Sequence, residues 1–330
     1  MNKFSDKALL SIKDLKVNFT TRSGVVQGVR GVNLYVDYGE TLGLVGESGS
    51  GKSVTFQAVL GLITLPGEVV SGDIQWKGKS ILGMNHNKYL QRIRGKEISI
   101  IFQDPMTSLN PVFTIGTQIT EVLSHHLKMN EKQARRRAME LLEVVNISAP
   151  EKRLKQYPHE FSGGMQQRVM IAMALACEPE LLIADEPTTA LDVTIQAQIL
   201  ELIADLQERL NLSVVMITHD LGVIAQLCHR IAVMYAGEIV EVANAEILFE
   251  NPAHPYTIGL LRATPRLDKV TERMIAIDGV PPNLINPPAG CPFAARCGYA
   301  IEECTYRVNS LAYYEKDHQV SCWRALERRF

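Results

Sequence analysis

The sequence predicts an α/β fold in which helices cover a parallel β-sheet, and three observations lead to this prediction. Short, mostly apolar runs alternate with longer stretches of helical periodicity. One apolar run leads directly into a glycine-rich loop, and another ends in two consecutive carboxylates. Strands that are buried on both faces of a parallel sheet have this apolar character. The runs are TLGLV (41–45), ISIIF (98–102), LLIAD (181–185) and SVVMIT (213–218).

The clearest helix is expected from Asn130 onward. Asn130 is a suitable N-cap, and Gln133 three positions later completes the pattern of a capping box. Apolar residues then recur at helical spacing. They are Ala134, Ala138, Leu141, Leu142 and Val145. The stretch from about 104 to 160 carries little strand signal, and we interpret it as a helical insert.

Composition narrows the class of protein. The 330 residues are 46% hydrophobic and 21% charged, with a net charge of −2, so nothing in the charge favours nucleic-acid binding. No apolar stretch approaches the roughly 20 residues that span a bilayer. The N-terminal MNKFSDKALLSIKDL has charges where a signal peptide needs an apolar core. We expect a cytoplasmic protein that relies on other chains for any membrane span.

The amino-acid composition of the sequence changes after about residue 245. Prolines crowd between residues 252 and 292, and proline at this density interrupts helices and central strands. We therefore predict two domains, residues 1–245 and 246–330, the second being an irregular C-terminal extension.

A phosphate-binding loop is predicted at residues 46–53, where GESGSGKS matches G-x-x-x-x-G-K-[ST] between a strand and a helix. The alternative, a chance glycine- and serine-rich turn, does not account for the complete motif in this context. Backbone N–H groups of such a loop point at phosphate oxygens, Lys52 would reach the β- and γ-phosphates, and Ser53 would bind Mg²⁺. The other loop residues expected to contact the nucleotide are Gly46, Ser48, Gly49, Ser50 and Gly51.

Two carboxylates follow one another at the end of the apolar run 181–185. Ligands bind at the carboxyl ends of parallel strands. Asp185 is suited to holding Mg²⁺, and Glu186 to acting as the base that activates water. The alternative is that these are two solvated acids in a loop. We favour the functional interpretation, because the pair ends an apolar run in a chain that also contains a phosphate loop.

Residues 161–165, Phe-Ser-Gly-Gly-Met, resemble the LSGGQ signature of ABC (ATP-binding cassette) ATPases. Phe replaces Leu and Met replaces Gln at the two ends, whereas the central Ser162, Gly163 and Gly164 are intact. The resemblance implies that these three residues approach the γ-phosphate of ATP.

Further positions resemble the family in the same order along the chain. Gln103 resembles the Q-loop glutamine that senses the Mg²⁺ site, and Asp192, in Ala-Leu-Asp at 190–192, resembles the D-loop aspartate. His219 resembles the switch histidine that contacts the γ-phosphate. Phe19 resembles the aromatic residue that stacks on adenine. The resemblance assigns catalytic roles to Glu186, His219 and Gln103.

Within the family, FQDPMTSLNP (102–111) and NPAHPYT (251–257) resemble the ATPase subunits of dipeptide and oligopeptide importers. Nickel-importer ATPases are close relatives, so nickel stays open as cargo. The resemblance implies a P-loop core with a β-rich edge, the helical insert and the C-terminal extension. It also implies a second ATPase subunit (a copy or a paralogue), two membrane permeases and an external substrate-binding protein, with this chain peripheral on the cytoplasmic face of the membrane.

Four cysteines lie close together near the C-terminus, whereas Cys177 and Cys228 are expected in the core. Four thiolates can hold a [4Fe–4S] cluster or zinc, although the close C-x2-4-C pairs of structural zinc sites are missing, and unligated thiols are the third possibility. The resemblance to peptide-importer ATPases favours the iron–sulfur cluster. Its ligands would be Cys291, Cys297, Cys304 and Cys322.

Two other functions compete with transport. One is an ABC ATPase that works on nucleic acid or ribosomes, but such proteins usually carry two cassettes or long coiled-coil inserts, and the sequence has neither. The other is a regulatory protein in which an iron–sulfur module is central and ATP hydrolysis is secondary.

Overall fold

The computed structural model describes residues 8–82, 86–104, 108–189, 191–263 and 277–329. Backbone contacts divide the chain into two compact units. The first unit contains residues up to 86 and from 217 onward, and the second contains residues 87–216. In the described part of the chain, no helix combines the length and the apolar character needed to cross a bilayer.

The first unit holds two groups of strands. A four-stranded antiparallel sheet has the order β2-β1-β4-β5, and a second group has the order β11-β12-β10-β9-β3. In the second group β3 is parallel to β9, and the other neighbours are antiparallel. The strands are β1 (Ala8–Thr21), β2 (Gly24–Asp37), β3 (Thr41–Val45), β4 (Gly67–Trp76), β5 (Lys79–Ser80), β9 (Arg230–Tyr235), β10 (Glu238–Asn244), β11 (Ala312–Glu315) and β12 (His318–Val320).

The helices of the first unit lie on both sides of residue 245, where the sequence predicts a domain boundary. They are α1 (Lys52–Val59), α9 (Leu221–Leu227), α10 (Ala245–Glu250), α11 (Pro255–Ala263), η2 (Ala294–Arg296), η3 (Glu302–Thr305) and α12 (Trp323–Leu326). A small apolar cluster joins Ala253, Val320, Cys322 and Ala325. Segments far apart in the C-terminal sequence therefore share one core, while the division into domains at 245 stays a prediction.

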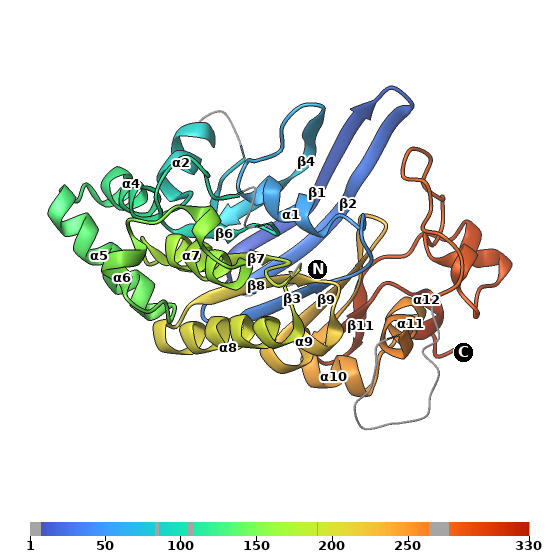
Figure 1. Ribbon diagram of the computed structural model, residues 1–330. Coiled ribbons are helices and arrows are strands. Elements are labelled where there is room, and N and C mark those ends of the chain that lie inside the picture. Colours follow the sequence, from blue (N-terminus) through green and yellow to red (C-terminus); the bar gives the residue numbers. More distant parts are fainter. Residues whose placement is uncertain (1–7, 83–85, 105–107, 190, 264–276, 330) are drawn as a thin grey trace. The chain divides into compact units, whose positions relative to one another are not determined.

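The long hairpin of β1 and β2 stands out in Figure 1. Along β1, Leu10, Ile12, Leu15 and Val17 are fully buried, so this strand contributes an apolar face to the unit. At the hairpin turn, the Thr21 hydroxyl donates to the carbonyl of Gly24 at 2.7 Å. Antiparallel strands at the N-terminus agree with the predicted β-rich edge.

The second unit combines parallel strands with most of the long helices. Strand β7 lies between β6, to which it is parallel, and β8. Between residues 108 and 160, a described stretch, the chain forms helices and no strand, and Figure 1 shows α4, α5 and α6 grouped together. The elements are α2 (His86–Ile93), β6 (Ile98–Ile101), α4 (Ile115–Leu127), α5 (Glu131–Val144), α6 (Pro150–Arg153), η1 (Pro158–Glu160), α7 (Gly163–Leu175), β7 (Leu181–Asp185), α8 (Val193–Leu210) and β8 (Ser213–Thr218), whose last two residues belong to the first unit.

The local predictions from sequence are confirmed. The apolar runs 41–45, 181–185 and 213–218 coincide with β3, β7 and β8, and the run 98–102 is one residue longer than β6. The side chain of Asn130 accepts from the Gln133 backbone, and that of Gln133 accepts from the Asn130 backbone, as a capping box requires.

Candidate functional site

The phosphate loop joins buried strand β3 to helix α1 and is closely packed against its neighbours. Gly46 has φ 156°, and a Cβ there would lie 2.1 Å from the carbonyl oxygen of Met234. Gly51 has φ 103°, and a Cβ there would lie 2.5 Å from the carbonyl oxygen of Gly28. Both positions exclude a side chain, because backbone from β9 and β2 occupies the space.

The lysine of the motif lies against its own loop. Lys52 is 5% exposed, and its ammonium donates to the carbonyls of Gly46 (2.8 Å) and Glu47 (3.0 Å). Gly237, in the β9–β10 turn, donates its N–H to the carbonyl of Ser50 at 2.9 Å. The Ser50 hydroxyl is buried and has no hydrogen-bond partner among the described residues. The loop thus brings a buried cation and a buried hydroxyl together with the N-terminus of α1, which is the chemistry that phosphate oxygens require.

Two other predicted site residues belong to the same unit. Phe19 is half-buried on β1, and its ring covers the positions of Gly28 and Gly67 on the flanking strands. A Cβ at Gly67 would lie 2.6 Å from the ring, so the aromatic side chain depends on glycine beside it. His219 is exposed directly after β8 and precedes Asp220, the N-cap of α9.

The second unit brings Gln103 and Glu186 together. Because β6 and β7 are parallel, with Ile101 beside Ala184, the residues that follow both strands come from the same edge. Asp185 ends β7 and is 5% exposed. Glu186 follows with φ 46°, a left-handed conformation that costs a non-glycine residue about 1–3 kcal/mol and clusters at functional sites.

The Glu186 carboxylate is oriented by two donors. Its Oε2 accepts from Nε2 of Gln103 at 3.0 Å and from the Thr189 hydroxyl at 2.9 Å. Sequence reasoning named the first donor and missed Thr189. Its position offered a signal, because a turn brings a hydroxyl three residues after an acid within reach of the carboxylate. The turn is present, since the Thr189 N–H donates to the Glu186 carbonyl at 3.2 Å.

The signature segment begins helix α7. Ser162 is the exposed N-cap residue, and its side chain makes no capping bond in the described structure. Gly164 is needed for packing, because a Cβ there would lie 2.6 Å from the Ile195 side chain on α8. Gln166 donates to the carbonyls of Pro158 and Phe161, which fixes the segment that leads into the helix.

Asp192 has a local structural role that the sequence did not predict. It is the N-cap of α8, and its side chain accepts from the N–H of Ile195 at 3.0 Å. Ala190, the first residue of the predicted D-loop, lies outside the described residues, as do residues 105–107 of the FQDPMTSLNP segment.

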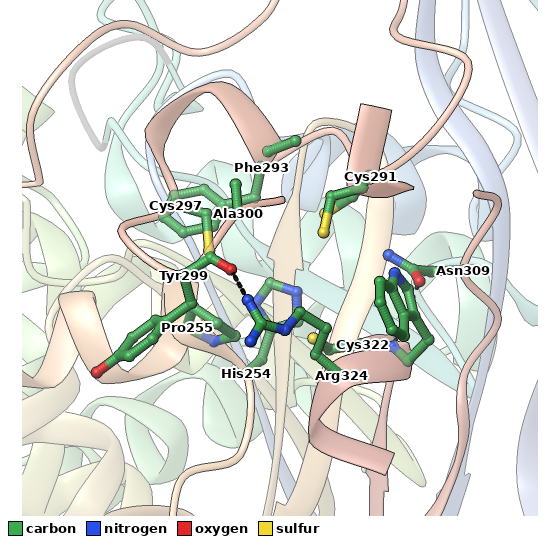
Figure 2. Close-up of a pocket in the computed structure, with 13 residues that line it drawn as sticks. His254, Pro255, Cys291, Phe293, Cys297, Tyr299, Ala300, Asn309, Cys322 and Arg324 are labelled. Atoms are coloured by element: carbon green, nitrogen blue, oxygen red, sulfur yellow. Dashed lines mark hydrogen bonds between the residues drawn. The ribbon is translucent and has the colours of Figure 1, made fainter. Parts of the chain in front are cut away.

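The four C-terminal cysteines line one largely apolar pocket together with His254, Phe293 and Arg324. Figure 2 shows the labelled thiols of Cys291, Cys297 and Cys322 around this pocket, where the Arg324 guanidinium donates to the Tyr299 carbonyl. Burial raises the pKa of Cys291 to about 12 and also raises the pKa of Cys297 and of Cys322.

The prediction of an iron–sulfur cluster at these four cysteines is wrong, and the zinc alternative is contradicted as well. Throughout the described ranges, no group of three or more His, Cys, Asp or Glu side chains is placed so that it could hold a metal ion. The physical reason lies in the pocket. Metal and cluster ligation requires several side chains directed at one point, and the cysteines that line the pocket do not form such a group.

Two family models match the chain. The model described as ABC transporter matches residues 29–189, which include the phosphate loop, the signature and the acidic end of β7. The model described as oligopeptide/dipeptide transporter, C-terminal region, matches residues 240–304.

Similar proteins extend over nearly the whole chain. The oligopeptide transport ATP-binding protein OppD of Bacillus subtilis is 55% identical over 317 residues, which cover 96% of this chain and 88% of that protein. The dipeptide transport ATP-binding protein DppD of the same organism is 52% identical, covering 96% of this chain and 94% of that one. OppD of Escherichia coli is 52% identical, with 90% and 88% covered.

Solved structures share the fold of much of the chain. The ATP-binding cassette MJ0796, seen as a dimer in a post-hydrolysis state with ADP and phosphate, superposes with a TM-score of 0.64 at 28% identity. The match covers 72% of this chain and 98% of that chain.

Proposed function

This chain belongs to the ATP-binding proteins of ABC transporters, and we propose that it hydrolyses ATP to power the import of dipeptides and oligopeptides. The observation that carries the proposal is similarity to peptide-transport ATP-binding proteins through both the cassette and the C-terminal region. The nickel alternative is not favoured, because these relatives are named for peptides. The iron–sulfur regulatory alternative is not favoured either, because its metal site is not found among the described residues.

We propose that the phosphate loop binds the triphosphate of ATP. The buried Lys52 ammonium offers a cation, and the Ser50 hydroxyl, with no partner among the described residues, offers a donor. Gly46, Ser48, Gly49 and Gly51 let the backbone follow the phosphates. Phe19 offers a half-buried ring for adenine.

Magnesium suits the proposed ligands in chemical type. The Ser53 hydroxyl, the Asp185 carboxylate and the Gln103 amide all offer oxygen, which Mg²⁺ prefers. The Gln103 amide donates its N–H to Glu186, which leaves its carbonyl oxygen as the ligand atom. When bound, the ion neutralises charge on the phosphates.

Glu186 is proposed as the base that takes a proton from the attacking water. The two donors on Oε2 fix the orientation of the carboxylate. His219, Asp192 and the signature residues Ser162, Gly163 and Gly164 are proposed to complete the site around the γ-phosphate. The signature would act on ATP held by a second ATPase subunit, either a copy or a paralogue.

The remaining partners follow from the transport function. We propose two permease subunits and an external substrate-binding protein, with this chain peripheral on the cytoplasmic face of the membrane. Residues 246–330 are proposed to form an extension to the ATPase domain. Closure of the ATPase pair would drive transport only through the differential affinity of its states for ATP.

The test is uptake of labelled dipeptides, oligopeptides and nickel by cells that lack this gene. We expect peptide uptake to be lost and then restored by the wild-type chain but not by Glu186→Gln. Lost nickel accumulation with unchanged peptide uptake would transfer the assignment to metal import. Unchanged uptake of both would contradict a transport role for these substrates.

A further inference from the structure

The C-terminal part of the chain holds the phosphate loop from outside the proposed ATP site. Arg296, in the 3₁₀ turn η2, donates through both terminal nitrogens to the carboxylate of Glu47, at 2.8 and 2.9 Å. Glu47 is the second residue of the loop, and the Arg296 side chain is only 6% exposed. A bidentate pair of this kind fixes both distance and orientation.

Arg296 is itself anchored at several points. It donates to the carbonyls of Asp278 (2.9 Å) and Ile277 (3.2 Å) and to the hydroxyl of Tyr235 (3.2 Å). Its bonds to Glu47 are the main reason that its pKa is raised. The guanidinium therefore cannot leave Glu47 without the loss of several other contacts.

A second contact reaches the same loop residue from α11. The Glu47 N–H donates to the hydroxyl of Tyr256 at 2.9 Å. Tyr256 is fully buried in an aromatic cluster with Tyr235 and Phe293, at ring-centre distances of 4.5 and 5.4 Å. The backbone N–H and the side chain of Glu47 are thus both bound by the segment after residue 245.

The start of α11 is held in turn by a buried carboxylate. Glu241 on β10 accepts from the N–H groups of Ala253 (2.6 Å) and His254 (3.0 Å) and lies 2.7 Å from Nε2 of His318 on β12. Glu241 and His318 are both fully buried. A continuous polar path therefore leads from the sheet through the turn before α11 to the phosphate loop.

We propose that Arg296 and Tyr256 are positioning residues that hold the phosphate loop in the shape that binds ATP. The inference rests on the proposed ATP function and adds a role for the C-terminal region within it. Two physical effects support it. A loop fixed before binding loses less conformational entropy when ATP arrives. Arg296 also compensates the Glu47 carboxylate, whose negative charge would otherwise repel phosphate across a short distance.

The experiment measures ATP affinity of the purified full chain with a fluorescent ATP analogue, together with steady-state hydrolysis and thermal unfolding. We expect Arg296→Gln to raise the Kd and the KM for ATP about ten-fold with kcat within about two-fold, since ground-state binding is what weakens. Arg296→Lys keeps the charge without the two-point contact and should raise Kd about three-fold. Arg328→Gln, at a 75% exposed arginine of the same region, is the matched control and should leave Kd unchanged.

A charge-pair rescue separates positioning from general stability. In Glu47→Gln with Arg296→Gln, the repelling carboxylate is gone and two amides can pair, so we expect Kd to return to within about three-fold of wild type. Should Arg296→Gln fail to fold, Arg296→Lys and Tyr256→Phe carry the same measurement. Unchanged Kd and KM in folded variants, with only a lower unfolding temperature, would overturn the inference.

Failure of the inference is distinguishable from failure of the proposed function. If wild type binds ATP, Lys52→Ala does not, and Arg296→Gln binds like wild type, only the positioning role is lost. If the wild-type chain binds no ATP, or Lys52→Ala binds it equally well, the ATP function itself is contradicted, and with it the role of Arg296.

Discussion

The phosphate loop and the acidic end of β7 are stabilised in different ways. The loop is surrounded by backbone, with Met234 and Gly28 too close to Gly46 and Gly51 for any side chain. Glu186 is held by polar side chains, an exposed Gln103 and a half-buried Thr189, and its own backbone is in a left-handed conformation. Close backbone packing limits the glycines of the loop, whereas hydrogen bonds from side chains orient the Glu186 carboxylate.

This difference matches two demands on an ATPase. A rigid loop lowers the entropy lost when phosphates bind. A carboxylate that acts as a base needs a defined orientation but can change its hydrogen bonds during the cycle, and the bond from Gln103 to Glu186 is exposed to competing water. Substitutions in the two regions should therefore alter different quantities.

The largest effect is expected from Glu186→Gln. The amide keeps the shape and can still accept hydrogen bonds, but it removes the proposed base, so we expect hydrolysis to fall by about 10²–10⁴-fold. ATP affinity should stay within about two-fold of wild type, because the phosphate loop is untouched. Hydrolysis in the reconstituted transporter and nucleotide affinity are measured side by side.

Lys52→Ala is the opposite control for that experiment. It removes the buried ammonium from the phosphate loop and should weaken nucleotide binding itself. If Glu186→Gln weakened binding as strongly as Lys52→Ala does, the separation between a binding region and a catalytic region would be wrong.

Gly46→Ala should unfold or severely destabilise the rigid region. Its methyl group would lie 2.1 Å from the Met234 carbonyl oxygen in a backbone conformation that disfavours a side chain. Steric overlap and backbone strain together predict a loss of about 4 kcal/mol in the free energy of unfolding, measured by urea denaturation.

Gly49→Ala is matched in chemistry, but its methyl group meets no atom within 4 Å. It should cost only about 1 kcal/mol, through its positive φ. Equal losses would show that close packing does not fix the loop.

Sequence patterns predicted two kinds of element in this fold: strands that are buried on both faces, and helix caps formed by residues close together in the sequence. The apolar runs correspond to β3, β6, β7 and β8, because a strand covered on both faces appears in the sequence as a nearly continuous apolar run. The capping box at Asn130 needs only residues three apart, so it was also readable. The short strands β11 and β12 gave no such signal, since they are only four and three residues long and β12 pairs with the distant β10.

Long-range contacts were beyond the sequence. Nothing local to Glu47 indicates that Arg296, 249 positions later, binds its carboxylate. The crowding of four cysteines and the family resemblance suggested a metal site, but neither specifies how the side chains are placed in space, and the described residues form no group that could hold a metal ion. The roles assigned to Phe19, His219 and Asp192 in ATP hydrolysis remain predictions.

Acid should loosen the anchor behind the phosphate loop. Burial lowers the pKa of His254 to about 4, despite the opposing charge of Glu241. In the unfolded chain this imidazole binds a proton as pH falls through about 6.5, whereas the folded state keeps it neutral until about pH 4. Its contribution to stability is therefore complete above pH 6.5 and declines by about 3 kcal/mol as the pH falls to 4.

The measurement is the free energy of unfolding between pH 7 and pH 4 for wild type and His254→Asn, whose side-chain oxygen can replace Nδ1 as acceptor for the Tyr256 N–H. Carboxylates titrate in both proteins, so the difference between the two curves isolates the histidine. We expect the difference to narrow as pH falls. Parallel curves would show that His254 is protonated equally in the folded and unfolded states.

The smallest effect is expected from Thr189→Val, which removes one of the two donors to Glu186 with little change in shape. Without the Thr189 hydroxyl the carboxylate should be held less firmly, and we expect kcat to fall about five-fold, or roughly 1 kcal/mol, the value of one hydrogen bond. Thr189→Ser restores the hydroxyl and should recover most of the rate. ATP affinity should be unchanged in both variants, because neither changes a residue of the phosphate loop. The carboxylate itself is retained in this variant, which is why the effect is far smaller than that of Glu186→Gln. A loss of 100-fold or more in Thr189→Val would mean that the acidic end is as rigidly determined as the phosphate loop, and the contrast between the two regions would not hold.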